Sequence, residues 1–470
     1  MQRFYDKTMT FQLITDQDIV KSFCTDSSNY PGYADALVRP KDTSEVVEIV
    51  KEANSKKIPI TTIGNRSSLT GSAAALGGWI LDTSQMTKIF EINKEEKFVI
   101  AEPGMMLSDF KKTMLENGLF YAPDPTSENE CFFGGSIATN ASGSRTFKYG
   151  STRKYVRSVE VVLASGEILT VRRPGIEKNT FGYLPFQNMV DIFVGSEGTL
   201  GVITKAEVDL LAKPENFFGG MVFFKTLSEA LDFVVNVRRG LLQQTPTTIS
   251  PRAVELFDHL GLGIIRPDSA FKIPENAMAG IFFEQEYRSD NFETILNNWL
   301  SFLEKNKAIV EDTIIAEQPK QQEELRRLRH KVPSELFEEG GKYVKDGGGK
   351  ISTDWSVPIN KIHEIINYAE RLAKEAKIKE PVIYGHIGNG HPHYNFIAKN
   401  TDEKKQILSV VHKTCQKVVS MGGTIAAEHG IGKIKKDFVK YQYPEPVINA
   451  MKSLKYSLDP NGIMAPGNMF

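Results

Sequence analysis

Four of the eight histidines in this chain fall in two short, glycine-rich segments. Residues 385–393 read GHIGNGHPH, and residues 428–433 read EHGIGK. Glycine allows the backbone to turn tightly and to approach a ligand closely. Imidazole and carboxylate groups on such loops are typical of a metal site or of an acid–base site. The two segments are therefore the first candidates for a reactive centre.

A strand is expected to begin at His393. In an extended chain His393, Asn395 and Ile397 share one face, and Tyr394 and Phe396 share the other. The polar face would then line a site while the aromatic face packs in the core.

His386 stands before a glycine turn that can fold it back toward His393. Two histidines and the carboxylate of Glu428, with coordination positions left for a substrate, suit Zn²⁺ or a similar divalent ion. The alternative is that these are loop histidines held by hydrogen bonds without a metal. The residues alone leave both interpretations open.

A second candidate is the loop 64–72, which reads GNRSSLTGS. Its backbone N–H groups can converge on one anion, and its small side chains let a pyrophosphate come close. The alternative is an ordinary polar surface loop. Neither a strand-associated G-x-G-x-x-G nor a G-x-x-x-x-G-K-[ST] occurs in the chain.

Composition narrows the class of protein. A length of 470 residues predicts two or three domains. The formal net charge of −1 and the lack of a long basic run argue against nucleic acid as a partner. The three cysteines are far apart, so we expect no disulfide framework and no cysteine-bound iron–sulfur cluster.

The expected location is cytoplasmic. The first seven residues have no apolar signal-like region. No apolar run approaches the roughly 18 residues that cross a bilayer. Peripheral contact with a membrane is left open, and so is a homodimer.

Hydrophobic periodicity indicates the elements that must position these residues. A helix is predicted over 42–56, with Asp42 or Thr43 as its cap, followed by a strand over 59–63. Further strands are predicted at 159–163, 168–171, 217–224, 280–286, 353–357 and 381–384, and helices near 227–240, 289–306, 317–340, 359–376 and 401–420. The change in pattern places a domain boundary near 213.

Several blocks together resemble a known family. Loop 64–72 is followed in order by PDPTS at 123–127, GGSIATNASG at 134–143, KYG at 148–150 and GSEGTLG at 195–201. This series is similar to the FAD-binding domain of the vanillyl-alcohol-oxidase (PCMH-type) flavoproteins. The similarity covers almost the whole chain and points to the branch of D-lactate dehydrogenases, the glycolate oxidase flavin subunit and D-2-hydroxyglutarate dehydrogenase.

The resemblance implies an α+β fold. It implies a PCMH-type FAD-binding domain of two subdomains over 1–213, an α+β substrate (cap) domain with an antiparallel sheet and the metal site over 214–425, and a C-terminal segment, 426–470, that returns to the FAD domain. FAD is expected to be non-covalent, because no histidine lies in 1–210. The expected FAD-binding residues are Gly64, Asn65, Arg66, Ser67, Ser68, Gly71, Ser72, Pro123, Thr126, Gly134, Gly135, Ala138, Asn140, Gly143, Tyr149, Gly150, Glu197, Gly198, Gly201 and Ile203.

The resemblance also implies roles in the reactive centre. His386, His393 and Glu428 match the family's metal ligands, His429 matches its proposed base, and Asn395 matches a residue that contacts substrate. Arg329 matches an arginine that binds the substrate carboxylate. The neighbouring Arg326 and Arg327 fit a basic helix face equally well, and Lys350 could replace the family lysine that is Ser352 here.

Four residues in two ligand-binding motifs depart from the family pattern. In the pyrophosphate loop, Ile63 and Arg66 replace a family arginine and a glycine; Arg66 could pair with a phosphate or point to solvent. In the metal motif, Asn389 replaces an aspartate and His391 replaces an asparagine. Asn389 removes a charge next to the metal ligands, and His391 could become an additional ligand, so metal identity and occupancy stay open.

The implied activity is the oxidation of a D-2-hydroxy acid, lactate-like, to a 2-keto acid. Hydride would pass to flavin N5, with metal assistance, and electrons would leave to a separate acceptor such as an electron-transfer flavoprotein, a quinone or a cytochrome. Two rivals remain. One is a flavin transferase similar to alkylglycerone-phosphate synthase, disfavoured because Ala427-Glu428-His429 stands where that enzyme has three histidines. The other is a flavin subunit that is active only within a larger oxidase complex.

Overall fold

The computed structural model describes residues 11–470 except 177, 181, 184–187 and 243–248. The first residues of the chain, where no signal-like region is expected, lie outside the described ones. The chain divides into two compact units. Unit 1 consists of the described residues up to Ser142, of Gly150–Lys213 and of Glu428–Phe470, and unit 2 consists of Gly143–Tyr149 and Pro214–Ala427. The short segment Gly143–Tyr149 thus packs with the second unit although it lies within the range 1–213.

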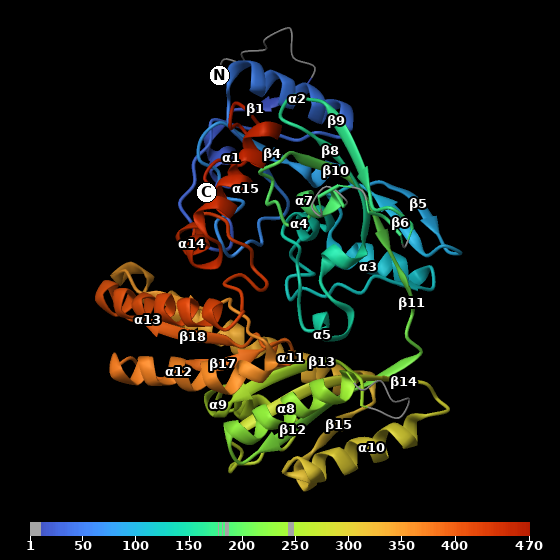
Figure 1. Ribbon diagram of the computed structural model, residues 1–470, viewed down its shortest axis with the longest axis vertical. Coiled ribbons are helices and arrows are strands. Elements are labelled where there is room, and N and C mark those ends of the chain that lie inside the picture. Colours follow the sequence, from blue (N-terminus) through green and yellow to red (C-terminus); the bar gives the residue numbers. More distant parts are fainter. Residues whose placement is uncertain (1–10, 177, 181, 184–187, 243–248) are drawn as a thin grey trace. The chain divides into compact units, whose positions relative to one another are not determined.

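Unit 1 contains two main sheets (Figure 1). The first has the order β1-β2-β4-β3 and is parallel from β2 to β3. The second is antiparallel, with the order β5-β6-β10-β8-β9. Their strands are β1 (Leu13–Ile14), β2 (Ala36–Val38), β3 (Ile60–Ile63), β4 (Trp79–Asp82), β5 (Ile89–Asn93), β6 (Phe98–Ala101), β8 (Val156–Val162), β9 (Ile168–Arg172) and β10 (Val202–Asp209).

Helix α2 (Thr43–Lys56) packs between strands of the two sheets. Its apolar residues Val46, Ile49 and Val50 are fully buried, and they share one cluster with Val38 of β2 and Val202 of β10. The carboxylate of Asp42 accepts the N–H of Glu45 at 3.0 Å, so Asp42 rather than Thr43 caps the helix. The predicted helix and its cap are confirmed.

The remaining elements of unit 1 are short except for two helices. They are α1 (Gln17–Lys21), α3 (Leu107–Glu116), β7 (Leu119–Phe120), α4 (Phe133–Ala138), α7 (Val190–Phe193), β11 (Leu211–Ala212), α14 (Val439–Gln442) and α15 (Glu445–Leu458). After α15 the chain runs beside β3, because Ile60 donates to the carbonyl of Ile463 at 2.7 Å and Ala465 donates to that of Ile60 at 2.8 Å.

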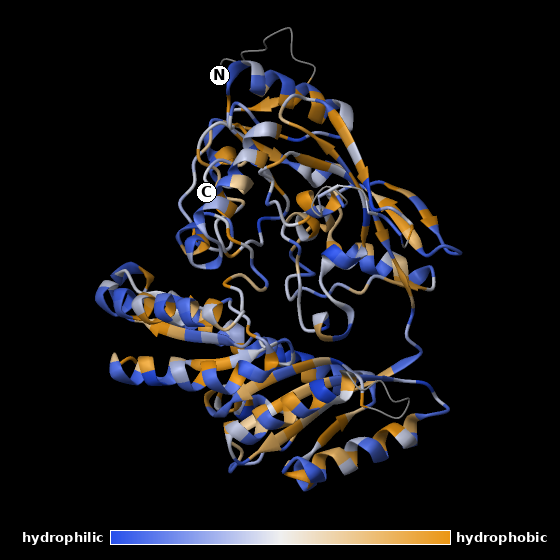
Figure 2. Cartoon of the chain, viewed as in Figure 1, coloured by the Kyte–Doolittle hydropathy of each residue, from blue (hydrophilic) through white to orange (hydrophobic). Residues whose placement is uncertain are grey.

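Unit 2 is built on a seven-stranded antiparallel sheet with the order β15-β12-β14-β13-β17-β18-β16. Its strands are β12 (Asn216–Phe224), β13 (Pro251–Asp258), β14 (Ala279–Tyr287), β15 (Ile314–Ala316), β16 (Gly349–Ser352), β17 (Val382–Gly385) and β18 (His393–Ala398). Figure 2 shows hydrophobic residues concentrated on these strands and alternating with polar residues on the helices.

Helices cover this sheet. Helices α9 (His259–Ile265) and α11 (Pro319–Gly341) pack in one cluster with Met221, Phe257 and Phe282 of the sheet. Helices α8 (Leu227–Leu242) and α10 (Phe292–Lys305) pack instead through Phe233 and Trp299, and the Trp299 ring stacks on Phe283 at 4.0 Å. The unit also contains α5 (Thr146–Tyr149), α12 (Ile362–Glu375) and α13 (Thr401–Ser420).

One predicted strand was wrong, and one strand was missed. Residues 353–357 form no strand; the strand is β16, which ends at Ser352, and Ser356 makes only an isolated bridge to Thr424. The central strand β13 was not predicted, because Arg252 and Glu255 interrupt its apolar pattern although both are buried. Among the described residues, none of the helices combines the length and the apolar composition needed to cross a membrane.

Candidate functional site

Loop 64–72 in unit 1 begins where β3 ends. Its hydroxyl groups are linked, because Ser72 Oγ donates to Ser68 Oγ at 2.8 Å and Ser68 Oγ lies 3.3 Å from Thr70 Oγ1. Gly71 has φ +73°, and a Cβ there would come within 3.0 Å of the Tyr30 side chain. The loop is therefore tightly turned and lined by small polar groups, as an anion-binding loop requires.

Arg66 in this loop is held by neighbouring residues, and its pairing with a phosphate stays a prediction. Its guanidinium donates to the carbonyl of Ser22 and lies over the Phe23 ring, 4.7 Å from the centroid. The residue itself has φ +60°, so an arginine occupies a backbone conformation that glycine adopts more easily.

The EHGIGK segment packs against this loop within unit 1. Thr70 Oγ1 donates to the carbonyl of His429 at 3.3 Å. Gly432 has φ +52°, and a Cβ there would lie 2.2 Å from the Thr70 carbonyl oxygen. The second glycine of the segment is thus required by a close backbone approach. The backbone of His429 is bonded to the loop, and its side chain is 23% exposed.

Glu197 joins this segment to two of the predicted cofactor blocks. Its buried carboxylate accepts the N–H groups of Ile431 and Gly432, each at 2.7 Å. Its own N–H donates to the carbonyl of Ala138 at 2.9 Å, and Gly195 donates to that of Ile137 at 3.1 Å. Burial raises the pKa of Glu197, and the two N–H donors oppose that shift.

Unit 1 holds most of the predicted cofactor residues: Gly64, Asn65, Arg66, Ser67, Ser68, Gly71, Ser72, Pro123, Thr126, Gly134, Gly135, Ala138, Asn140, Gly150, Glu197, Gly198, Gly201 and Ile203. Gly143 and Tyr149 belong to unit 2, where the Tyr149 hydroxyl donates to the carboxylate of Glu286. A Cβ at Gly135 would meet no atom within 4 Å, so the backbone there faces open space. Small residues, hydroxyls and open backbone suit a nucleotide cofactor.

In unit 2 three imidazole rings form a buried group. The ring centroids of His386 and His393 lie 5.3 Å apart, those of His391 and His393 4.5 Å, and those of His386 and His391 5.6 Å. All three side chains are at most 7% exposed. As predicted, His393 begins a strand, β18, and the turn at Gly390, with φ +68°, brings His386 back beside it.

Hydrogen bonds define which ring nitrogens carry protons. His386 Nδ1 lies 2.7 Å from Glu255 Oε1, and His393 Nδ1 lies 3.2 Å from the carbonyl oxygen of Thr353. Because both partners accept, each Nδ1 carries the hydrogen, and a neutral ring then has its lone pair on Nε2. Such a tautomer is the one that ligates metals through Nε2.

Glu428 is the residue directly after the end of unit 2. The preceding Ala427 donates its N–H to the carbonyl of Asp354 at 2.9 Å, which anchors the chain next to the histidines. His386 and His393 each offer an imidazole nitrogen in unit 2, and Glu428 offers a carboxylate at the start of the last segment of unit 1. Two imidazole nitrogens and one carboxylate are a donor set that fits a divalent cation such as Zn²⁺.

His391 has a different environment from the other two histidines. Its Nδ1 donates to the carbonyl of Trp355 at 2.6 Å, and its Nε2 lies 3.5 Å from Asp354 Oδ1. The Nε2 atom of His391 is therefore directed toward Asp354.

Asn395 lies on the same face of β18 as His393 and is 1% exposed. Its Nδ2 donates to the carbonyls of His393 at 3.1 Å and Val382 at 3.3 Å. Its Oδ1 is buried and has no hydrogen-bond partner among the described residues. A buried acceptor without a donor is costly, so this oxygen is suited to accept from a bound ligand.

Lys350 and Ser352 share this face, because they pair across the sheet with Ile397 and Asn395. Burial lowers the pKa of Lys350 to about 8.

Sequence reasoning missed the carboxylate that organises this face. Glu255 on β13 is 1% exposed and binds both His386 and Arg329, whose Nε and Nη2 each lie 3.1 Å from Oε2. Burial by itself would raise the pKa of Glu255, but His386 and Arg329 hold it below its usual value. The predicted clamp Arg329 therefore has a partner within the protein. The only signal for Glu255 in the sequence was a charged residue within a largely apolar run.

A second missed carboxylate is Glu284 on β14. It accepts from Arg252 at 2.6 Å and from Arg145 at 2.9 Å. Burial alone would raise its pKa, but together the two guanidinium groups hold it at about 2. Arg326 approaches the same carboxylate at 3.9 Å, whereas Arg327 pairs with Glu324 on its own helix.

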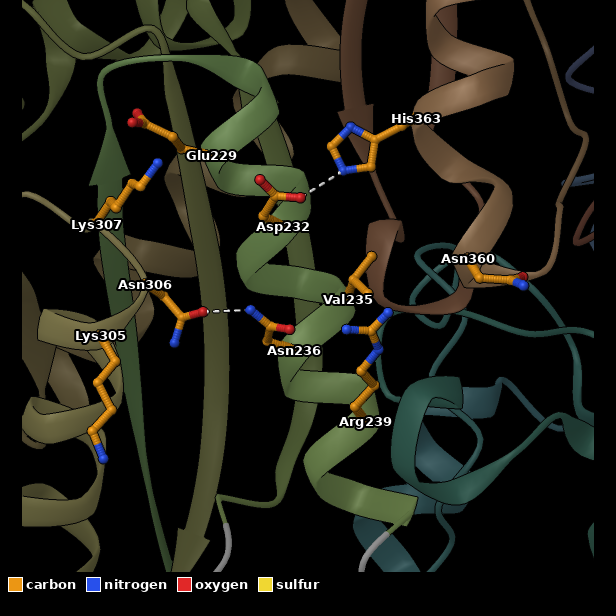
Figure 3. A pocket seen from close by; sticks show the side chains of 10 residues that line it. All are labelled: Glu229, Asp232, Val235, Asn236, Arg239, Lys305, Asn306, Lys307, Asn360 and His363. Atoms are coloured by element: carbon orange, nitrogen blue, oxygen red, sulfur yellow. Dashed lines mark hydrogen bonds and ion pairs between the residues drawn. The ribbon is translucent and has the colours of Figure 1, made fainter.

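Unit 2 also has an open cavity of about 420 Å³, shown in Figure 3. It lies between α8, the end of α10 and the start of α12, and Asp232 and His363 point toward each other across it, 3.0 Å apart. Its lining mixes acidic, basic and amide side chains, most of them exposed. None of the predicted site residues lines it.

These two units define a flavoprotein oxidoreductase fold, and comparison with known proteins identifies the family. Residues 34–172 match the model of the FAD binding domain, and residues 213–469 match that of the C-terminal domain of FAD linked oxidases. The chain belongs to the FAD-linked oxidase family.

Among its relatives, glycolate oxidase subunit GlcD of Bacillus subtilis (strain 168) is 31% identical, over 94% of this chain and 90% of its own length. D-Lactate dehydrogenase of Archaeoglobus fulgidus is 31% identical, over 92% and 90%. D-2-Hydroxyglutarate dehydrogenase of Stutzerimonas stutzeri is 27% identical, over 98% and 96%.

Solved structures show the same fold at low identity. p-Cresol methylhydroxylase with substrate bound has a TM-score of 0.74 at 18% identity and covers 97% of this chain and 93% of its own. Alkyldihydroxyacetonephosphate synthase has a TM-score of 0.72 at 18% identity and covers 97% and 83%. The predicted α+β, PCMH-type fold and the predicted family are confirmed, and the protein is an FAD-dependent oxidoreductase.

Proposed function

We propose that this protein oxidises a small D-2-hydroxy acid to the corresponding 2-keto acid and passes the electrons to a separate acceptor. The observation that carries the proposal is the buried face of unit 2, on which His386, His393 and Asn395 lie together. The relatives named for D-lactate, glycolate and D-2-hydroxyglutarate add support, because they match nearly the full length of the chain.

The cofactors supply the redox and Lewis-acid chemistry. When bound, non-covalent FAD supplies a hydride acceptor at N5, and a divalent cation, proposed to be zinc, supplies a Lewis acid for the 2-hydroxyl group. The residues proposed to hold the cation are His386, His393 and Glu428. The predicted residues of unit 1, together with Gly143 and Tyr149, are proposed to hold FAD.

The protein's own side chains bind the substrate and move one proton. His429 is proposed to accept the proton of the 2-hydroxyl group at a ring nitrogen. The Oδ1 atom of Asn395 would accept a hydrogen bond from the substrate, which would satisfy its buried lone pairs. Arg329 and Lys350 are the proposed cations for the substrate carboxylate, although Arg329 must share its guanidinium with Glu255.

A separate electron acceptor is proposed because the three cysteines are dispersed. Cys24, Cys131 and Cys415 are each buried and lie far apart in the chain. A relative from Arabidopsis thaliana, 27% identical, is named D-lactate dehydrogenase [cytochrome], mitochondrial. An electron-transfer flavoprotein, a quinone and a cytochrome are the acceptor classes to test, and a cytoplasmic location with peripheral membrane contact is compatible with each.

The function is tested by anaerobic flavin bleaching with a panel of D- and L-2-hydroxy acids, together with metal analysis of the same sample. Bleaching by one or more D-2-hydroxy acids supports the proposal. A protein whose flavin no hydroxy acid reduces would contradict it and favour the transferase that shares the fold. Requirement for a second protein would favour the subunit of a larger complex.

The role of His429 is tested by His429→Asn in rapid-mixing experiments. Because a positioned base contributes about 10²–10⁴-fold, the rate of flavin reduction should fall by at least roughly 10²-fold, while the substrate Kd changes little. The matched control is His363→Asn in the cavity of Figure 3, which should keep the parent rate. A nearly unchanged rate in His429→Asn would place the base elsewhere.

The metal is tested by His386→Ala and His393→Ala. Each should lower the bound metal and the activity together, while FAD stays bound. Full activity of the parent protein after chelation, with no metal found in the sample, would reject the metal and leave both histidines as substrate contacts.

A further inference from the structure

We propose that the C-terminal segment forms a clasp that holds loop 64–72 in its FAD-binding shape, and that Lys433 and Asn468 are the positioning residues of this clasp. The C-terminal clasp consists of residues 429–434 and 468–469. The inference rests on the proposed FAD site at loop 64–72 and concerns residues that carry no role in it so far.

The backbone of the clasp binds the end of the loop directly. The carbonyl of Thr70 accepts the N–H groups of Lys433 at 2.9 Å and of Ile434 at 3.1 Å. The Thr70 hydroxyl donates to the carbonyl of His429 at 3.3 Å. One residue of the loop thus makes three hydrogen bonds to the clasp, and it is 1% exposed.

Lys433 adds a buried cation to this contact. Its Nζ donates to the carbonyl of Gly71 at 3.1 Å and to Asn468 Oδ1 at 2.6 Å, and the residue is 3% exposed. Both acceptors are neutral, and no carboxylate lies within salt-bridge distance of its ammonium group among the described residues. A buried ammonium without a carboxylate partner is costly, and burial lowers its pKa to about 8 although Asp26 and Glu197 oppose that shift.

This arrangement makes sense if an anion binds at the loop. An anion held by the loop backbone would interact favourably with a cation that is bound to the carbonyl of Gly71. The pyrophosphate of FAD is such an anion. Lys433 would then both hold the shape of the loop and supply a positive charge that favours the bound anion.

Asn468 connects the loop to a second predicted cofactor block. Its Nδ2 donates to the carbonyl of Ser72 at 2.9 Å and to the carbonyl of Glu197 at 3.1 Å. The next residue, Met469, donates its N–H to the carbonyl of Gly432 at 3.0 Å, which closes the clasp on itself. Glu197 in turn accepts from the N–H groups of the clasp, so the three segments are linked in a ring of hydrogen bonds.

The loop has little internal support of its own. Within the loop, side-chain hydrogen bonds join only the hydroxyl groups of Ser68, Thr70 and Ser72, apart from one to the backbone of Thr70. The side chains of Asn65 and Arg66 donate outside the loop, to the carbonyls of Glu130 and Ser22. The clasp is therefore expected to fix the position of Thr70, Gly71 and Ser72 at the end of the loop. Loss of one clasp residue should weaken FAD binding more than it weakens unit 1.

The test uses the holoprotein and the variants Lys433→Met, Asn468→Ala and the double variant. The FAD Kd and the rate of FAD release are measured by flavin fluorescence well below the unfolding temperature. Because a hydrogen bond to a charged group is lost, each single variant should raise the FAD Kd about tenfold or more. The double variant should raise it by less than the product of the two, since Lys433 and Asn468 bind each other.

Two further variants separate positioning from general stability. Lys433→Arg keeps the charge and the donors, so it should recover most of the FAD affinity lost in Lys433→Met. Lys205→Met is the matched control, since it removes another lysine of unit 1, whose Nζ pairs with Glu160 at 3.0 Å. It should leave the FAD Kd within about threefold of the parent, because a partly exposed pair contributes little.

The outcomes distinguish the two proposals. A parent protein that binds no FAD refutes the proposed function. A parent that binds FAD, with Lys433→Met and Asn468→Ala unchanged in Kd, overturns the clasp alone. An equal loss in Lys205→Met also overturns it. If Lys433→Met does not fold, Asn468→Ala and its release rate decide the question.

Discussion

The two units bury carboxylates in different ways. In unit 1 the buried Glu197 binds backbone N–H groups of the EHGIGK segment. In unit 2 the buried Glu255 and Glu284 bind side chains: one holds His386 and Arg329, and the other holds Arg145 and Arg252. Near the candidate cofactor loop of unit 1 a buried carboxylate thus holds a loop backbone, whereas near the histidines of unit 2 buried carboxylates hold ionisable side chains.

The difference predicts unequal costs of mutation. A backbone N–H that loses its acceptor is an uncharged donor. A loop near the surface can adjust so that this N–H donates to water instead. A guanidinium that loses its carboxylate inside a sheet remains charged and buried, which costs several kcal/mol. The largest effects are therefore expected in unit 2.

The largest effect is expected for Glu255→Ala. It leaves the 9%-exposed Arg329 without its carboxylate and removes the acceptor that orients His386. The free energy of unfolding should fall by about 3–5 kcal/mol. Urea unfolding followed by the fluorescence of Trp299 and Trp355, in a Trp79→Phe background, reports on unit 2 alone. Glu375→Ala on the exposed face of α12 is the control. If both changes have an equally small effect, the high cost predicted for losing a buried carboxylate in unit 2 is refuted.

The next effect concerns acid stability through Glu284. Its pKa in the folded protein is about 2, below the value of about 4.3 for an unfolded glutamate. A depressed pKa adds stability above the unfolded value, and that stability is lost as the pH falls from about 4.3 toward 2. The shift corresponds to about 3 kcal/mol at most. Unfolding of the parent and Glu284→Gln between pH 5 and 2 should show a steeper loss in the parent; parallel curves would mean that Glu284 is not held by its arginines.

A smaller effect is expected in unit 1 for Gly432→Ala. The added Cβ would lie 2.2 Å from the Thr70 carbonyl oxygen in a residue with φ +52°. Strain and a displaced contact should cost about 1–3 kcal/mol. Gly118→Ala is the control, because it also has positive φ, +78°, but open space around the added atom. Thermal unfolding should separate the two variants; equal losses would show that the backbone angle alone matters.

The smallest effect is expected for Asp232→Asn in the cavity of Figure 3. The variant removes a pair with His363 whose side chains are 65% and 35% exposed. Such a pair contributes about 0–1 kcal/mol, and the rate of flavin reduction should equal that of the parent. A strong loss of activity would mean that this cavity belongs to the reactive machinery.

Local patterns were sufficient for much of the fold. The helix capped by Asp42, the strand that begins at His393 and the long helices of unit 2 follow from periodicity and caps, because these signals act between residues close in sequence. The strand predicted at 353–357 was wrong, since the alternating residues Thr353, Trp355 and Val357 are buried in a segment that pairs only through an isolated bridge. The strand β13 was missed because its charged residues are paired only with distant partners.

The amino-acid sequence by itself determined the kinds of groups available: three clustered histidines, a glycine-rich loop with hydroxyls, and the EHGIGK segment. Only the tertiary structure decided which of them meet. It turned His386 back onto His393, assigned Glu255 to hold both His386 and Arg329, and placed Lys433 and Asn468 against loop 64–72. The physical reason is that buried hydrogen bonds depend on distance in space. The hydrogen-bonded partners named here lie 74 to 396 residues apart in the chain.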